Sequence, residues 1–295
     1  MKLETLIDRA ALQPKVIAVA AAEDNEVIEA VAKSIQAGLA RFILFGDETK
    51  IKELLNSYTL SDSSAVTVRH CAQPAEMAVR AVKEGEADIL MKGNIATATL
   101  LKAVLNKEYG LRKGKVLSHV AVFEVPSYDR LIFLTDVAMN IAPDLEQKVA
   151  IIQNAVQVAH SIGVKMPKVA PLAAVEVVNP AMQATVDAAL LAQMNRRGQI
   201  TNCIVDGPLA LDNAVSKLAA EHKGITGDVA GQADILLVPN IESGNVLYKS
   251  LVYFANSKVG AIIAGAKAPI VLTSRADSAE AKLYSIALAV ATASL

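Results

Sequence analysis

Three side chains suited to chemistry stand together near the end of the chain: Ser274, Arg275 and Asp277. An apolar run of β type, 269–273, leads into them, and an alanine-rich pattern with helical spacing, 281–291, follows. α/β proteins bind ligands where a strand ends and a helix begins, and a helix N-terminus favours an anion. The planar guanidinium of Arg275 suits a phosphate. This junction therefore predicts the catalytic edge of a site for a phosphorylated substrate.

A purely structural explanation covers the same junction. Asp277 is a suitable N-cap residue, and Glu280, three positions later, would complete a capping box. Ser274 would then only close the strand. Both explanations stay open at this point, and other stretches of the chain have to decide between them.

Three further predicted strand ends carry glycine or polar residues. The carboxyl ends of parallel strands lie on one side of a sheet, so all four ends can share one crevice. Lys92 would add a cationic group there, while Gly93 and Gly244 would let backbone N–H groups approach an oxyanion closely. For each glycine the alternative is an ordinary tight turn. The three stretches are Lys92-Gly93-Asn94, Asp206-Gly207-Pro208 and, behind Asn240, Ser243-Gly244-Asn245.

Helix and strand patterns alternate along almost the whole chain. Short apolar runs bounded by turn residues predict strands, and longer amphipathic stretches predict helices. This rhythm, in a chain dominated by Ala, Val, Ile and Leu, indicates an α/β fold with mostly parallel sheets. The predicted strands include 15–21, 41–45, 65–70, 87–91, 169–175, 202–205, 235–238, 261–264 and 270–273, and the longer predicted helices are 23–38, 144–162, 184–196 and 244–255.

The rhythm breaks once, at two strand-like runs, 116–125 and 130–137. Only residues 126–129 separate them, which leaves no room for a helix and predicts an antiparallel hairpin. A chain of 295 residues is long enough for two domains. The end of the hairpin, near residue 138, is the predicted boundary between them.

Composition argues against several classes of function. The net charge is −1, so no broad basic surface for nucleic acid is expected. No apolar run approaches the length of a membrane span, and the first residues do not resemble a secretion signal. Cys71 and Cys203 are isolated, which indicates a reducing compartment such as the cytoplasm and disfavours a disulfide or a Cys-based metal site. The four histidines also lack the spacing of metal ligands.

Three common site motifs are missing from the sequence. No strand is followed by GxGxxG, the dinucleotide fingerprint, and there is no GxxxxGK[ST] phosphate loop. No GxSxG elbow surrounds Ser274. These absences disfavour the usual dinucleotide site, a P-loop nucleotide hydrolase and a serine hydrolase.

Four stretches carry motifs that occur together in one family: ADILMKGNIATATLL (87–101), IVDGPLALDNA (204–214), VAGQADILLVPNIESGNVLYK (229–249) and SRADSAE (274–280). They appear in the same order in the phosphate acyltransferases, the phosphotransacetylase and phosphotransbutyrylase family, which this chain resembles over nearly its whole length. The Gly244-Asn245 segment is the most specific part of the match. The predicted hairpin and the run at 172–191 look more like the butyryl branch than the acetyl branch.

The resemblance implies a fold and an activity. Members have two α/β domains like those of isocitrate and isopropylmalate dehydrogenases, with the site in the cleft between them and a homodimer contact in the second domain. Residues 1–138 and 275–295 would form the first domain, and 139–274 the second. The family exchanges an acyl group between coenzyme A and inorganic phosphate in a ternary complex, without a metal, a resident cofactor or a covalent acyl-enzyme. Butyryl-CoA, coenzyme A, phosphate and acyl phosphate are thus the expected partners, along with a second copy of the chain.

The resemblance also assigns roles to residues. Ser274 and Arg275 fall on the family's catalytic serine and its neighbouring arginine. Together with Asp277 they are the expected catalytic residues. The expected substrate-binding residues are Lys92, Gly93, Asn94, Asp206, Ser243, Gly244, Asn245, Lys249 and Tyr253.

Two positions depart from the acetyl-type members of the family. Those members carry an aspartate, proposed as the base, where this chain has Ala281, and a site arginine where it has Tyr253. Asp277 and Glu280 are left as candidates for the carboxylate that deprotonates the thiol. The missing arginine beside Tyr253 is hypothesised to reshape the acyl pocket for longer chains.

Three alternatives to a butyryl-transferring enzyme stay open. One is an acetyl-transferring member of the same family. Another is a metal- and nicotinamide-dependent oxidoreductase on a related scaffold, which would recruit Asp136, Asp206 and Asp212 for the metal. The third is a sensor of coenzyme A or acyl phosphate that has lost its base, for which Ala281 is the main support.

Overall fold

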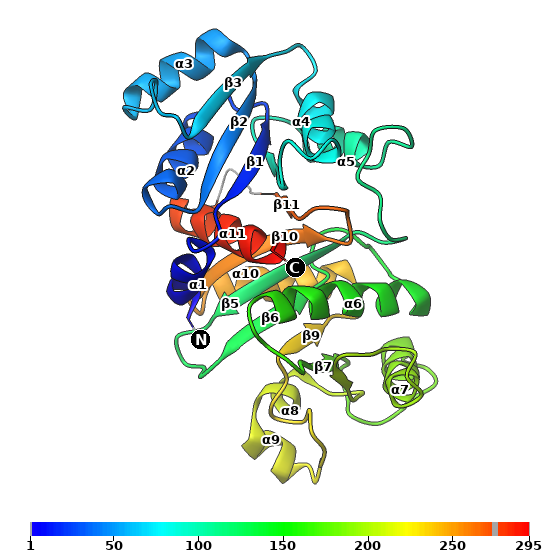
Figure 1. Ribbon diagram of the computed structural model, residues 1–295. Coiled ribbons are helices and arrows are strands. Elements are labelled where there is room, and N and C mark those ends of the chain that lie inside the picture. The colour runs from blue at the N-terminus through cyan, green and yellow to red at the C-terminus, as the bar shows by residue number, and fades with distance from the viewer. Residues whose placement is uncertain (1, 273–276, 295) are drawn as a thin grey trace. The chain divides into compact units, whose positions relative to one another are not determined.

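The computed structural model describes residues 2–272 and 277–294. The chain separates into two compact units (Figure 1). The first unit comprises Met1–Gly114 and Gly260–Leu295, and the second comprises Lys115–Val259. No helix among the described residues combines the length and the apolar character that crossing a membrane requires.

The first unit is built on a sheet with the strand order β3-β2-β1-β4-β11-β10. Every pair in it is parallel except β11 with β10. The central strands are continuous apolar runs because helices cover both faces of a parallel sheet. The strands are β1 (Lys15–Ala20), β2 (Ala40–Gly46), β3 (Val66–His70), β4 (Ile89–Lys92), β10 (Lys258–Ala264) and β11 (Ile270–Val271).

Two groups of helices cover the first-unit sheet (Figure 1). α11 packs against α1 and α2, and α2 reaches α3, while α4 and α5 form the other group. The last helix of the chain therefore closes a layer that the first helices begin. The bounds are α1 (Leu3–Ala10), α2 (Asn25–Gln36), α3 (Glu48–Ser57), α4 (Pro74–Lys83), α5 (Thr97–Val104) and α11 (Ala279–Thr292).

The second unit is built on a sheet with the strand order β5-β6-β9-β7-β8. β5 and β6 form the antiparallel hairpin predicted from the sequence, and the remaining pairs are parallel. The strands are β5 (Ser118–Glu124), β6 (Leu131–Thr135), β7 (Lys168–Pro171), β8 (Ile204–Val205) and β9 (Ile235–Leu237). The helices are α6 (Leu145–Ser161), α7 (Gln183–Arg196), α8 (Leu211–Val215), α9 (Lys217–His222) and α10 (Ile241–Tyr253).

The limits of the compact units differ from the domain limits predicted near 138 and 274. The hairpin belongs to the second unit because β6 pairs with β9, with Phe133 opposite Ile235. β11 belongs to the first unit because it pairs with β4. A break in the strand–helix rhythm marks a change of connection, whereas sheet partners decide where a strand packs.

Candidate active site

The carboxyl edge of the first-unit sheet carries Lys92. β11 and β4 run parallel with Val271 opposite Met91, so both strands end at this edge. Lys92 is the last residue of β4 and is half-buried. The predicted catalytic residues Ser274 and Arg275, which follow β11 in the sequence, lie outside the described residues.

Gly93 is needed for close packing of the backbone, and its amide is not open to a ligand. A Cβ at this position would lie 2.0 Å from Ala21 O and 2.7 Å from Ala20 O. The Gly93 N–H donates to Ala20 O at 2.9 Å, and the Asn94 N–H donates to Ala21 O at 2.6 Å. Lys92 Nζ donates to Gly93 O at 3.2 Å. The amide that the sequence offered to an oxyanion is therefore engaged by the end of β1, and this detail of the prediction is corrected.

Ser278, not Asp277, caps helix α11. The Ser278 hydroxyl oxygen accepts from the Ala281 N–H at 3.1 Å, which satisfies one of the first amides of the helix. Glu280 Oε1 accepts from the buried Tyr284 hydroxyl at 2.8 Å, one turn further on. The capping box expected from Asp277 and Glu280 is therefore wrong. Asp277 lies half-buried one residue before the cap.

The Ser243-Gly244-Asn245 stretch lies inside the first turns of α10, which begins three residues earlier than predicted. Asn240 caps the helix, because its Oδ1 accepts from the Ser243 N–H at 3.0 Å and from the Ser243 hydroxyl at 2.8 Å. The Gly244 N–H donates to Asn240 O at 3.2 Å. A Cβ on Gly244 would lie 2.7 Å from Asp136 O and 3.0 Å from Val137 Cα. Glycine here lets α10 pack closely on the end of β6, and its amide is not an open donor.

The other predicted residues of α10 share one side of the helix. Asn245, Lys249 and Tyr253 are spaced four residues apart and are all exposed. Tyr253 is 68% exposed, so its ring is available to a ligand. The structure thus brings these three predicted residues together, whereas Asp206 follows the edge strand β8 and accepts from the Gly207 N–H at 3.1 Å.

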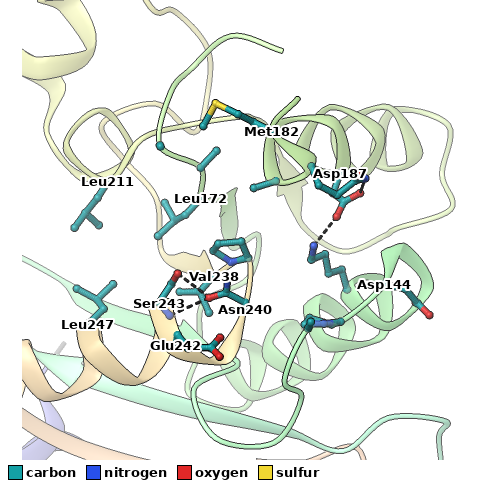
Figure 2. A pocket seen from close by; sticks show the side chains of 18 of the residues that line it. Asp144, Leu172, Met182, Asp187, Leu211, Val238, Asn240, Glu242, Ser243 and Leu247 are labelled. Atoms are coloured by element: carbon teal, nitrogen blue, oxygen red, sulfur yellow. Dashed lines mark hydrogen bonds and ion pairs between the residues drawn. The ribbon is translucent and has the colours of Figure 1, made fainter. Parts of the chain in front are cut away.

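A cavity of about 1290 Å³ lies in the second unit (Figure 2). The segments that follow β7 and β9 line it, together with the N-terminal ends of α6, α7 and α10, so it opens at the carboxyl edge of the parallel strands. Of the predicted site residues that the structure describes, Ser243 alone lines it. Most of the other lining residues are apolar and resemble ordinary core in the sequence, where Pro239-Asn240 after a strand was the only signal.

One buried ion pair lies on the cavity wall. Lys148 Nζ of α6 is 2.5 Å from Asp187 Oδ2 of α7, and the two side chains are only 7% and 10% exposed. Gln183 Nε2 donates to Asp187 Oδ1 at 2.8 Å. The carboxylate is therefore satisfied from two sides, as a buried charge requires.

Comparison with known sequences identifies the family. The family model described as "Phosphate acetyl/butaryl transferase" matches residues 1–77 and 63–290. The chain belongs to this phosphate acyltransferase family. The "Probable phosphate butyryltransferase" of Bacillus subtilis is 62% identical over 98% of this chain and 97% of its own. The phosphate butyryltransferase of Clostridium beijerinckii is 54% identical over 93% and 92%. The phosphate acetyltransferase of Thermotoga maritima is 48% identical over 98% of both chains.

Solved structures confirm the fold class of this phosphate acyltransferase. A branched-chain phosphotransacylase from Enterococcus faecalis superposes with a TM-score of 0.84 at 38% identity, covering 94% of this chain and 98% of its own. A 4-hydroxythreonine-4-phosphate dehydrogenase from Klebsiella pneumoniae, only 11% identical, reaches 0.55 over 95% and 99%. The α/β architecture with mostly parallel strands is thus shared with a dehydrogenase, as predicted.

The carboxylates that the oxidoreductase alternative would recruit for a metal are engaged within the fold. Asp136, 2% exposed, accepts hydrogen bonds from four backbone N–H groups and one side-chain amide. Asp212 Oδ2 lies 3.3 Å from Lys223 Nζ. In this phosphate acyltransferase Asp136 instead fixes the loop on which α10 rests. Its donors are His119 N, Ala138 N, Met139 N, Asn140 N and Asn140 Nδ2.

His119 is a buried imidazole beside this loop, and its burial predicts a loss of stability in acid. Burial lowers the pKa of His119 to about 4, although the charge of Asp136 opposes the shift. Its Nδ1 has no hydrogen-bond partner among the described residues, and its ring centroid lies 6.1 Å from that of Tyr248 in a T-shaped arrangement. In the unfolded chain the pKa returns to about 6.5.

Stability should therefore fall as the pH drops from about 6.5 to about 4, because the unfolded chain takes up a proton that the folded chain does not. Between pH 7 and pH 5 this loss is about 2 kcal/mol. His119→Phe keeps the packing and removes the titration. Urea unfolding at both pH values should show that the variant loses about 2 kcal/mol less than the wild type on acidification. Equal losses would contradict this account of His119.

Proposed function

We propose that the chain is a phosphate butyryltransferase, which transfers a butyryl or a short branched acyl group between coenzyme A and inorganic phosphate. The observation that carries the proposal is the 62% and 54% identity to two relatives of that name, over more than nine-tenths of this chain and of each relative. Coenzyme A, phosphate and the acyl phosphate are substrates, and no resident cofactor is invoked. We expect a homo-oligomer.

The chemistry is a direct transfer in a ternary complex. The thiolate of coenzyme A attacks the carbonyl carbon of the acyl phosphate, a C–S bond forms, and the C–O bond to phosphate breaks with its electron pair leaving on phosphate. We assign Ser274 and backbone donors to the charge that builds on the carbonyl oxygen. Arg275 and Lys92 hold the phosphoryl group, and Asp277 takes the thiol proton.

The exposed face of α10 supplies the remaining contacts in the proposal. Lys249 and Asn245 offer a cation and an amide to the substrate from adjacent helical turns. Tyr253 stands where the resemblance places an arginine in acetyl-type enzymes, so an aromatic ring replaces a charge. We expect this exchange to favour an acyl group longer than acetyl. Ser243 and Asp206 stay proposed contacts of lesser weight, because the structure shows each bonded to its own neighbours.

A cytoplasmic location is part of the proposal. Cys71 and Cys203 are both free, and burial raises the pKa of the Cys203 thiol to about 11, which keeps it protonated and unreactive. Unpaired thiols suit a reducing compartment.

Relative turnover on three thioesters tests the proposed function. Purified protein is supplied with phosphate and acetyl-, butyryl- or isobutyryl-CoA, and release of the thiol is followed. Butyryl- or isobutyryl-CoA should give a kcat/KM at least about tenfold above that of acetyl-CoA, because a fitted methylene is worth about 1–3 kcal/mol. A preference for acetyl-CoA would select the acetyltransferase alternative, which the Thermotoga relative represents. Binding without any release would select the sensor.

A further inference from the structure

The cavity of the second unit has two unlike walls (Figure 2). One wall is apolar, and in the close-up the labelled leucines and the methionine lie on it, on the side away from Asp187. The Lys148–Asp187 pair and Asp144 lie on the opposite side, and Glu242 lies beside Ser243 at the start of α10. The apolar wall consists of Leu172, Met182, Leu211, Val238 and Leu247, and the carboxylates that line the cavity are Asp144, Asp187 and Glu242.

The charged groups of the lining add up to a negative balance. Against its three carboxylates, the lining formed by the described residues has a single ammonium, that of Lys148, and Asp187 already holds it at 2.5 Å. The formal sum is −2. A phosphate or the phosphates of an adenine nucleotide would meet this field as like charges, so the cavity repels them.

The helix N-termini at the cavity do not offset its negative charge. Helix ends favour anions, yet two of them are already filled from within. The Asp144 carboxylate accepts from the Gln147 N–H at 2.8 Å at the start of α6. The Asn240 amide oxygen accepts from the Ser243 N–H at 3.0 Å at the start of α10. These caps occupy first amides of α6 and α10, whereas α7 has no side-chain cap and carries the Asp187 carboxylate within its first five residues.

The volume of the cavity further limits which ligand it can bind. Cavities for drug-sized ligands measure about 300–1,000 Å³, are mostly apolar and hold a few polar groups that fix orientation. At about 1290 Å³ this one is far larger than inorganic phosphate or a four-carbon acyl group needs. Gln183, Ser243 and Ser250 supply polar groups suited to amides. The occupant is therefore long, mostly uncharged and able to form hydrogen bonds.

We propose that this cavity binds the acyl-pantetheine arm of the acyl-CoA substrate. The inference rests on the proposed function, which supplies the substrates among which the cavity must choose. Phosphate is small and anionic, and the nucleotide end of coenzyme A is highly charged, whereas the arm is long and neutral with two amides. Acyl-CoA is thus held by an apolar wall of the second unit, and that wall adds to the chain-length preference expected from Tyr253.

Cavity-filling variants test the inference. Leu190 of α7 and Val246 of α10 both line the cavity and are 44% and 66% exposed, so a larger side chain at either position does not disturb the core. Leu190→Trp and Val246→Trp place an indole at two separate parts of the lining. Gln193→Trp is the matched control, because Gln193 is also exposed on α7 but does not line the cavity.

Binding is measured by calorimetry without phosphate, using butyryl-CoA and, as a probe that lacks the nucleotide, butyryl-pantetheine. Both filled variants should bind both probes at least about tenfold more weakly, since an indole in the cavity overlaps the ligand. The KM for phosphate and all values of the control should stay within about twofold of the wild type.

Unchanged affinity in both filled variants would overturn the inference. A changed molar mass with unchanged affinity would also overturn it and would assign the cavity to a contact between two copies of the chain. Failure of the proposed function looks different: the wild type would then release no thiol from any acyl-CoA, whatever the filled variants bind.

Discussion

Asp277→Asn is expected to lower the rate of acyl-CoA formation by about 10²–10⁴-fold at neutral pH, the usual contribution of a positioned base. The thiol of coenzyme A has an ordinary pKa of about 8.5, so most of it is protonated near pH 7 and needs a base to become a nucleophile. Ala281 stands where the resemblance places a proposed base, an aspartate, in acetyl-type enzymes. Asp277 is the replacement we propose, because it is a half-buried carboxylate one residue before Ser278, the cap of α11.

The pH profile separates a lost base from a damaged fold. As the pH rises toward 8.5, solvent ionises more of the thiol, so the defect of Asp277→Asn should shrink by up to about tenfold per pH unit. A merely structural defect would not follow the ionisation of the thiol. Glu280→Gln is the matched control, since Glu280 accepts from the Tyr284 hydroxyl and its change should cost only a few-fold. Small and equal effects in both variants would remove Asp277 from the mechanism.

The fold was predictable because its signals are local. β1 and β4 each contain a continuous run of apolar, buried residues. Such a run is typical of a strand that is covered on both faces. The hairpin was predictable from the short link between its strands. The limits of the units were not, because they depend on which strands pair across long stretches of sequence. The pairing of β6 with β9 joins positions about a hundred residues apart, and no local pattern encodes it.

The site was predictable only in part, and its glycines show why. Gly93 and Gly244 were correctly singled out as positions of close approach, but the atoms that approach are carbonyl oxygens of Ala21 and Asp136 rather than a ligand. A glycine in the sequence can indicate that a Cβ would not fit at that position, but it does not show whether protein atoms or a ligand fill the space. The observed cap of α11, Ser278, lies one residue after the predicted cap, Asp277, for a similar reason. Both residue types are good caps, and the sequence alone does not show which one accepts the hydrogen bond.

The cavity was invisible to sequence analysis because it is assembled from residues that resemble core. Leu172, Leu211 and Leu247 come from three separate segments, and each alone has the spacing of a buried side chain. Only the fold brings them together around an empty volume. Its single strongly polar feature, the ion pair of Lys148 with Asp187, joins helices 39 positions apart in the sequence. Because both of its side chains are buried, that pair should be costly to break.

Lys148→Met is expected to destabilise the protein by about 3–5 kcal/mol, because it leaves the Asp187 carboxylate buried without its cation. The double variant Lys148→Met/Asp187→Leu should recover most of that loss, since replacing a whole buried pair by apolar groups is often neutral. The matched control is Lys33→Met, which breaks the exposed i,i+4 pair of Lys33 with Glu29 and should cost only about 0.3–0.5 kcal/mol. Urea unfolding of the wild type and the three variants at pH 7 measures all four values. A loss in Lys148→Met as small as in Lys33→Met, or a double variant no better than the single one, would show that burial of the charge is not what makes this contact costly to break.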